Sequence, residues 1–188
     1  MTTFYLSREE KKYLLKLARD AIRNAFAKKR QLQIPPKEYK NLFQKRGAFV
    51  TLYKEERTLR GCIGIIEPIY PLYEVVQEVA VSSAFKDPRF PPLTPEEFNQ
   101  VWIEISVLSP LKKGSVEEVK VGVHGVYIKK GIHSGLLLPQ VPIEYGWDKE
   151  TFLRHVCLKA GLHPECYKES DCELYLFTAE IFSEKDFD

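Results

Sequence analysis

The chain has 188 residues, of which 44% are hydrophobic and 29% charged, and its formal net charge is +2. This composition is typical of a globular protein with a sizeable core and excludes a disordered chain. No apolar run approaches the ~20 residues that cross a bilayer, and the N-terminus lacks the basic start and apolar stretch of a secretory signal. We therefore expect a cytoplasmic protein with one domain over residues 1–188.

The four cysteines are too few for a disulfide framework at this length, so we expect free thiols. The charge is uneven along the chain, because the charged residues of 1–30 are mostly basic and those of 165–188 are mostly acidic. The simplest interpretation is a pair of solvated faces. An RNA-binding patch would need more arginine and exposed aromatic rings, so nucleic-acid binding is the weaker alternative.

In the first half of the chain, a capping box at Ser7–Glu10 and apolar residues at helical spacing predict a helix over about residues 7–29. Pro35 and the proline after it end any continuation. Residues 48–53 and 57–66 are rich in β-branched and aromatic types, which predicts a hairpin around a short charged turn.

A second helix is expected over residues 71–85, where apolar residues keep helical spacing after a proline. The proline-rich stretch Asp87–Pro92 fits neither a helix nor a strand. A short turn near 95–98 then leads into a strand at about 100–109, in which apolar and polar residues alternate.

The second half repeats this order. Strands are expected near 123–130 and 134–139, a helix from Asp148 to about Leu162, and a last strand near 172–183. Each half therefore shows the order strand, strand, helix, strand.

Strands mixed with helices in this order predict an α+β fold rather than a parallel sheet. We expect two similar halves, at about 45–110 and 120–183, arranged around one shared, mainly antiparallel, barrel-like sheet. The repeat indicates an internal duplication.

The most unusual stretch is Leu59–Gly64, where Gly61 and Gly64 flank Cys62 inside a predicted strand. Glycine is unfavourable in a strand, so two of them indicate a bulge or a backbone that something must approach closely. On a regular strand Arg60 and Cys62 project to the same face, and a guanidinium beside a thiol favours the reactive thiolate. The alternative is an inert buried cysteine with a surface arginine.

The loop Asp87–Phe90 is the second candidate. It carries an acid at Asp87, a base at Arg89 and a ring at Phe90, which together could clamp an anionic or planar ligand. The same Asp–Arg pair could equally serve only to hold the loop shut.

Four further candidates lie in the second half. Gln140 and Glu144 follow an apolar strand, where pockets often open, and Trp147 comes soon after. His124 precedes a strand and could act as a base or a ligand. Structural roles for the glutamine and the histidine, and a solvated Glu144, are the alternatives.

We expect no metal site. The histidines and cysteines near the C-terminus have poor spacing and no Cys-x-x-Cys pair. They are His155, Cys157, His163, Cys166 and Cys172.

The hexamer Leu59–Gly64, read as Leu-Arg-Gly-Cys-Ile-Gly, resembles the signature of the AMMECR-type domain family, whose bacterial members are called AmmeMemoRadiSam system protein A. The resemblance continues in order over roughly residues 10–182. It includes residues 84–93, His124-Gly125, residues 135–140 with Glu144, Trp147-Asp148, Phe152-Leu153 and residues 159–162.

This resemblance implies an α+β fold with two similar halves, and a face where the hexamer, the Asp87–Phe90 loop and residues 135–140 could meet. It also implies a pathway shared with a Memo-type protein and a radical S-adenosylmethionine protein, with physical contact as an option. It names no reaction and no cofactor.

Three functions therefore stay open. The first is an enzyme, or a component of an enzyme system, in which Cys62 is a nucleophile or a ligand and Arg60 tunes it or holds an anion. In that case Glu144 or His124 would move a proton. The second is a non-catalytic adaptor that holds a small ligand or a protein partner, and the third is RNA binding. The expected ligand contacts are Gly61, Gly64, Asp87, Arg89, Phe90, Gln140 and Trp147.

Overall fold

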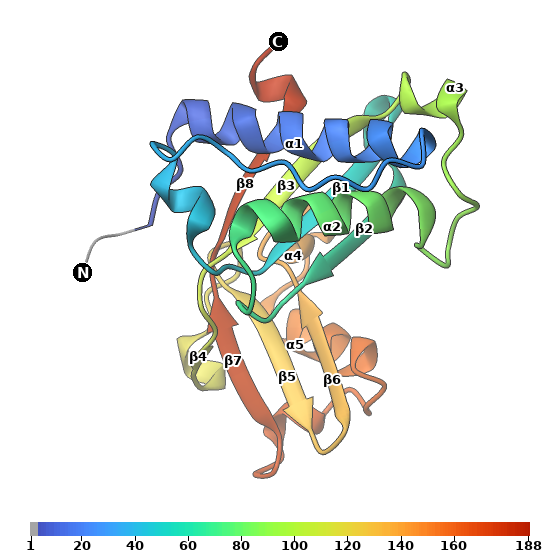
Figure 1. The fold of residues 1–188 in the computed structure, drawn as a ribbon. Coiled ribbons are helices and arrows are strands. Elements are labelled where there is room, and N and C mark those ends of the chain that lie inside the picture. The colour runs from blue at the N-terminus through green and yellow to red at the C-terminus, as the bar shows by residue number, and fades with distance from the viewer. Residues whose placement is uncertain (1–3) are drawn as a thin grey trace. The chain divides into compact units, whose positions relative to one another are not determined.

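The computed structural model describes residues 4–188, which form two compact units that we describe separately (Figure 1). Unit 1 comprises the described residues up to Leu108 together with Glu180–Asp188, and unit 2 comprises Ser109–Ala179. No helix within the described part of the chain is long and apolar enough to span a membrane.

Helix α1 covers Arg8–Phe26 and begins as the capping box predicts. The Ser7 hydroxyl accepts the Glu10 amide at 3.1 Å, and the Glu10 carboxylate accepts the Ser7 amide at 2.9 Å. The helix ends three residues before the predicted end, and Lys28 then adopts a left-handed conformation with φ of 55°. The buried stripe of α1 is formed by Leu14, Leu15, Leu17, Ala18 and Ile22.

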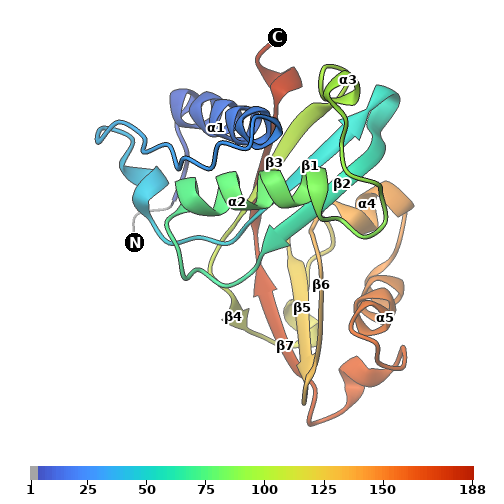
Figure 2. The ribbon, with the colours of Figure 1, turned by 45° about the vertical axis from the view of Figure 1, so that its right-hand side comes forward.

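The sheet of unit 1 has the strand order β2-β1-β3-β8. Its strands are β1 (Ala48–Lys54), β2 (Thr58–Ile65), β3 (Trp102–Leu108) and β8 (Ala179–Ser183). Strand β1 runs antiparallel to both β2 and β3, which confirms the predicted hairpin. Helix α2 (Leu72–Phe85) packs against β1 and β2, as Figure 2 shows, and also against α1. The short helix α3 is Pro95–Phe98.

The sheet of unit 2 has the order β4-β7-β5-β6. Its strands are β4 (Lys112–Lys113), β5 (Gly125–Lys130), β6 (His133–Leu137) and β7 (Glu173–Phe177). Strand β5 is antiparallel to both β6 and β7.

Two helices accompany this sheet, α4 (Val141–Tyr145) and α5 (Lys149–Lys159). The carboxylate of Asp148 caps α5 by accepting the Thr151 amide at 2.8 Å, as predicted for the start of that helix. Helix α5 packs on β5 and β6 and buries a core around Phe152 and Val156 (Figure 2).

The two units share a topology. In unit 1, β1 lies between β2 and β3, and α2 packs on β1 and β2. In unit 2, β5 lies between β6 and β7, and α5 packs on β5 and β6, with the short β4 added at the sheet edge. Strands β2 and β6 also each carry a glycine against the helix that packs on them. A methyl group at Gly61 would stand 2.1 Å from the Ser83 carbonyl oxygen, and one at Gly135 would stand 2.5 Å from the Ala160 amide nitrogen. The internal duplication stays a prediction, and this likeness is compatible with it.

The predicted α+β class is confirmed, but the prediction of one shared barrel-like sheet was wrong. The strands form two separate open sheets, with β2 and β8 at the edges of one and β4 and β6 at the edges of the other. The expected last strand at 172–183 is in fact two strands, one in each sheet. It breaks at Thr178, whose amide donates to the Ser109 hydroxyl while its carbonyl accepts the Ser109 amide, both at 2.8 Å.

Candidate functional site

A side chain of helix α2 forms hydrogen bonds with both β1 and β2. Val50 and Ile63 are register partners on the two strands. The hydroxyl of Ser83 stands between them, accepting the Ile63 amide at 2.8 Å and donating to the Val50 carbonyl at 2.7 Å. The buried serine thus ties α2 to both strands of the hairpin next to Cys62.

The predicted bulge is confirmed. The register passes from Leu52 opposite Gly61 to Tyr53 opposite Leu59, which leaves Arg60 as the extra residue. The close approach that Gly61 allows is made by α2.

Gly64 has a similar structural reason. A methyl group there would stand 2.3 Å from the ring of Phe49. Both predicted ligand-contacting glycines therefore have packing roles in unit 1.

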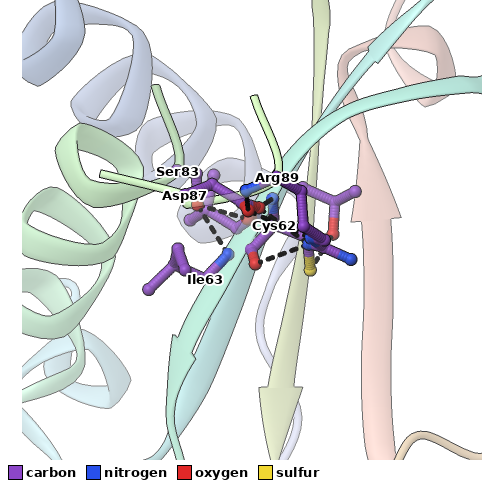
Figure 3. Close-up of polar contacts among 7 residues, drawn as sticks. Cys62, Ile63, Ser83, Asp87 and Arg89 are labelled. Carbon is purple, nitrogen blue, oxygen red and sulfur yellow. Dashed lines mark hydrogen bonds and ion pairs between the residues drawn. The ribbon is translucent and has the colours of Figure 1, made fainter. Parts of the chain in front are cut away.

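Cys62 is half-buried and held by polar groups from two other segments. Its register partner Thr51 donates a hydrogen bond from Oγ1 to Sγ at 3.2 Å. Its own amide donates to Oδ2 of Asp87 at 2.9 Å, as Figure 3 shows. A hydroxyl that donates to sulfur stabilises the thiolate more than the thiol.

Asp87 and Arg89 bond the backbone of Cys62 on both sides of its α-carbon, Asp87 at the amide and Arg89 at the carbonyl (Figure 3). Oδ1 of Asp87 accepts hydrogen bonds from the backbone amide and from Nε of Arg89, both at 3.0 Å. Oδ2 accepts one from Nη2 of Arg89 at 2.7 Å. The same Nη2 donates to the Cys62 carbonyl at 3.3 Å. The Asp87 side chain is 2% exposed, whereas that of Arg89 is 51% exposed. The predicted Asp–Arg pair therefore both closes the loop and presents a guanidinium to solvent.

The electrostatics of this pair follow from its hydrogen bonds. The bonds from Arg89, and then the Cys62 amide, hold the pKa of Asp87 well below its usual range against the opposing effect of burial. The pKa of Arg89 is raised, first by its bond to Asp87, with a smaller contribution from Cys62. Because Asp87 stays ionised and its oxygens are engaged, it suits an orienting role rather than that of a general base.

Arg60 lies on a different network. Its Nε donates to Glu97 at 3.0 Å, and its Nη2 donates to Glu97 at 2.8 Å and to the Pro91 carbonyl at 2.9 Å. The bonds from Arg60 to Glu97, followed by the bond from Lys54, hold the pKa of Glu97 well below its usual range. The alternation that would pair Arg60 with Cys62 fails at the bulge, and Arg89 supplies the guanidinium that bonds the Cys62 peptide.

The ring of Phe90 links the two arginines. The guanidinium carbon lies 5.7 Å from the ring centroid for Arg60 and 5.6 Å for Arg89. Nη1 of Arg60 is buried and has no hydrogen-bond partner among residues 4–188. The Asp87–Phe90 loop thus places an exposed and a buried cation near one aromatic ring.

The other predicted residues belong to unit 2. Nδ1 of His124 accepts the Lys120 amide at 3.1 Å. Gln140 precedes α4, and its buried Oε1 lacks a hydrogen-bond partner in the described part of the chain. Glu144 is an exposed residue of α4. A common face of these residues with Cys62 stays a prediction.

Trp147 lies in a stack of three rings. Its ring centroid is 4.9 Å from that of Tyr145 and 3.8 Å from that of His155.

Two residues that contact the site, Thr51 and Ser83, were not predicted from the sequence. Thr51 gave no signal, because threonine is ordinary in a strand. Ser83 did give one, since it interrupts an apolar helical stripe at a fully buried position.

Three hollows of about 830, 460 and 530 Å³ lie among the described residues. Cys62, Asp87 and Arg89 line none of these three, and His124 lines the one of 460 Å³. Among residues 4–188, no three His, Cys, Asp or Glu residues are grouped so that they could hold a metal ion. Cys157 and Cys166 are buried, and burial raises the pKa of Cys157 to about 11.

Known proteins resemble this chain over nearly its whole length. The AMMECR1 family model matches residues 15–182. Protein TK0174 of Thermococcus kodakarensis is 46% identical over 183 residues, covering 92% of this chain and 89% of that protein. Protein MK0488 of Methanopyrus kandleri is 46% identical over 190 residues, covering 96% and 91%.

A solved structure has the same fold. The crystal structure of uncharacterized protein PH0010 from Pyrococcus horikoshii matches with a TM-score of 0.88 and 46% identity, covering 97% of this chain and 95% of that one. The family model, the sequence relatives and the solved structure agree, and the chain belongs to the AMMECR1 family.

Proposed function

We propose that this protein is one component of an enzyme system and that its reactive group is Cys62. The observation that carries this proposal is the set of polar contacts on one cysteine. Thr51 donates to its sulfur, and Asp87 and Arg89 fix its peptide. An inert core thiol needs none of these contacts, whereas a nucleophile or a ligand-binding thiol needs a stabilised thiolate in a fixed position.

The surroundings favour a small anionic substrate or ligand. The Arg89 side chain is 51% exposed and can bind a carboxylate or phosphate, and the ring of Phe90 beside it offers a planar face. Glu144 and His124 are proposed to move protons, and Gln140 and Trp147 to contact the ligand. The pathway shared with a Memo-type protein and a radical S-adenosylmethionine protein rests on the resemblance to bacterial AmmeMemoRadiSam proteins.

The test is alkylation of the intact chain, with the rate at each cysteine read by peptide mass spectrometry across pH. We expect Cys62 to react at neutral pH and to reach half its maximal rate below the ~8.5 of a free thiol. Cys157 serves as an internal reference, because burial raises its pKa to about 11. Arg89→Gln and Thr51→Val should slow the reaction of Cys62 at neutral pH, whereas Arg30→Gln should not. A Cys62 that reacts no faster than an ordinary or inaccessible thiol overturns the proposal.

A variant with Cys157, Cys166 and Cys172 changed to alanine checks the assignment by a second route. If this variant folds, its single remaining thiol must reproduce the pH profile. If it does not fold, the profile of the intact chain decides.

One observation favours a non-catalytic adaptor as the second candidate. The Asp87–Phe90 loop is rigidly closed and carries exposed side chains at Pro88 and Arg89, which suits recognition of a protein partner. Capture of a Memo-type protein that survives Cys62→Ala but fails with Arg89→Ala would select this function. RNA binding stays the weaker alternative, and filter binding that is absent at low salt would exclude it.

A further inference from the structure

A hollow of about 830 Å³ lies in unit 1, away from Cys62. Its volume falls in the range of sites for small molecules. It is lined by the last turns of α1, the residues that follow them and one face of α2, and its floor includes six apolar side chains. These are Ala21, Ala25, Ile65, Val75, Val81 and Phe85.

Residues 28–32 form one rim of the hollow, and we call the segment 28–33 the strap. The left-handed conformation of Lys28 turns the chain at the end of α1, and Figure 1 shows the strap running back alongside that helix. The buried side chain of Gln77 then fastens it to α2. Gln77 Oε1 accepts the Gln33 amide and Gln77 Nε2 donates to the Gln33 carbonyl, both at 2.9 Å. The rim is therefore a fixed part of the fold.

The strap places three cations at this rim. Lys28, Lys29 and Arg30 are exposed and line the hollow. In the part of the chain that the structure describes, their side chains make no hydrogen bond or ion pair. Two acidic residues also line the hollow: Glu74 accepts the Tyr73 hydroxyl at 3.1 Å, and Glu78 lies 4.0 Å from Lys86, a fourth cation of the lining. Cationic side chains therefore outnumber the carboxylates there. The rim thus carries unpaired positive charge beside an apolar floor.

Two large side chains stay partly open to solvent at the same hollow. Leu32 is 48% exposed and Tyr70 is 54% exposed, and both line it. Burying apolar surface of this kind is favourable. An apolar molecule that covers these side chains would therefore bind with a favourable hydrophobic contribution.

We propose that this hollow binds a monomeric amphipathic anion, a molecule with an alkyl or aryl body and a carboxylate, phosphate or sulfonate head. The body covers the apolar floor, and the head lies against the cations of the strap, where charge-assisted hydrogen bonds are available. This site is separate from Cys62 and does not depend on the function proposed above.

The test uses anilinonaphthalene sulfonate as a fluorescent probe on the full chain, with displacement by dodecyl phosphate below its micelle concentration. Dodecanol has the same body without the charge. We expect one saturable site per chain, and displacement by dodecyl phosphate at least about tenfold tighter than by dodecanol. High salt should reduce that preference, because it screens exposed charges.

Two variants connect binding to the hollow. Ala25→Trp should fill the floor and abolish displaceable binding of the probe. Lys28→Gln with Lys29→Gln and Arg30→Gln should weaken dodecyl phosphate about tenfold or more and leave dodecanol unchanged. The matched control is Lys37→Gln with Lys40→Gln and Lys45→Gln, which removes the same charge from exposed residues of unit 1 that do not line the hollow.

Three results would overturn the proposal. Probe binding that Ala25→Trp leaves intact places the site elsewhere. Equal losses in the strap variant and its control indicate only a net-charge effect. Binding to anionic phospholipid vesicles without binding of monomeric dodecyl phosphate indicates a membrane surface instead. Circular dichroism and thermal unfolding of each variant separate loss of binding from loss of fold.

Discussion

Gly61 of β2 and Ser83 of α2 lie so close that a methyl group on the glycine would stand 2.1 Å from the serine's carbonyl oxygen. Because backbone is the obstacle, Gly61→Ala must separate strand and helix, and we expect a loss of about 1–3 kcal/mol in the free energy of unfolding. Urea denaturation measures this loss. Ser134→Ala, at an exposed strand position, should stay within about 0.5 kcal/mol. Equal stability of Gly61→Ala and the wild type would show that the contact yields easily.

The hydroxyl of Ser83 has its own measurable role. Ser83→Ala leaves the Ile63 amide and the Val50 carbonyl without the group that joins them. Unsatisfied buried polar groups cost about 1–3 kcal/mol each, so we expect a loss of about 2–3 kcal/mol in urea denaturation. Ser82→Ala is the matched control on the same helix. The alkylation rate of Cys62 should also change in Ser83→Ala, since the strand that carries it is released.

Asp87 predicts a pH dependence of stability. A carboxyl group whose pKa is lowered by folding stabilises the protein above its unfolded pKa of ~3.9, and this contribution disappears as the pH falls toward the lower folded value. Asp87→Asn should therefore cost about 2–3 kcal/mol at pH 7. The difference from the wild type should narrow below about pH 4.

Urea denaturation at several pH values tests this, with Glu67→Gln, an exposed carboxylate, as the control. A difference that stays constant down to pH 2 would contradict the role of the ionised carboxylate. Glu97, whose pKa is also lowered, should add a loss of the same sign in the wild type.

The two arginines should separate in their effects. Arg60→Met breaks a buried pair and should destabilise unit 1 by about 2–4 kcal/mol, while the reaction of Cys62 at neutral pH changes little. Arg89→Met should do the opposite, because its side chain is half exposed and bonds the Cys62 peptide. Alkylation and unfolding measured on both variants decide this. If Arg60→Met slows alkylation more than Arg89→Met, the sequence-based pairing of Arg60 with Cys62 is restored.

Much of the fold follows from local sequence signals. The capping box at Ser7 places the start of α1, and Asp148 places the start of α5. The end of α1 was missed because a lysine, rather than a glycine, makes the left-handed turn at position 28. The division at Thr178 was missed because apolar residues continue on both sides of it, and a change of sheet leaves no mark in such a pattern.

The site was predictable to the same extent. The glycines around Cys62 and the Asp87–Arg89 loop are visible as local patterns, and the structure brings them together in unit 1. The direction of Arg60 was not predictable, because one extra residue in a strand reverses the alternation. Contacts made across large sequence distances, such as that of Ser83 with Val50, depend on the packing of the helix on the sheet.

The reciprocal bonds between Ser109 and Thr178 join the two places where the chain enters and leaves unit 2. When the two ends of a segment are bonded to each other, the segment can be removed and the flanking chain rejoined by a short turn. Unit 2 should therefore be expressible alone as residues 109–179, and unit 1 should accept a tight turn in its place. The bonds between Ser109 and Thr178 would then be what allows the two units to be separated.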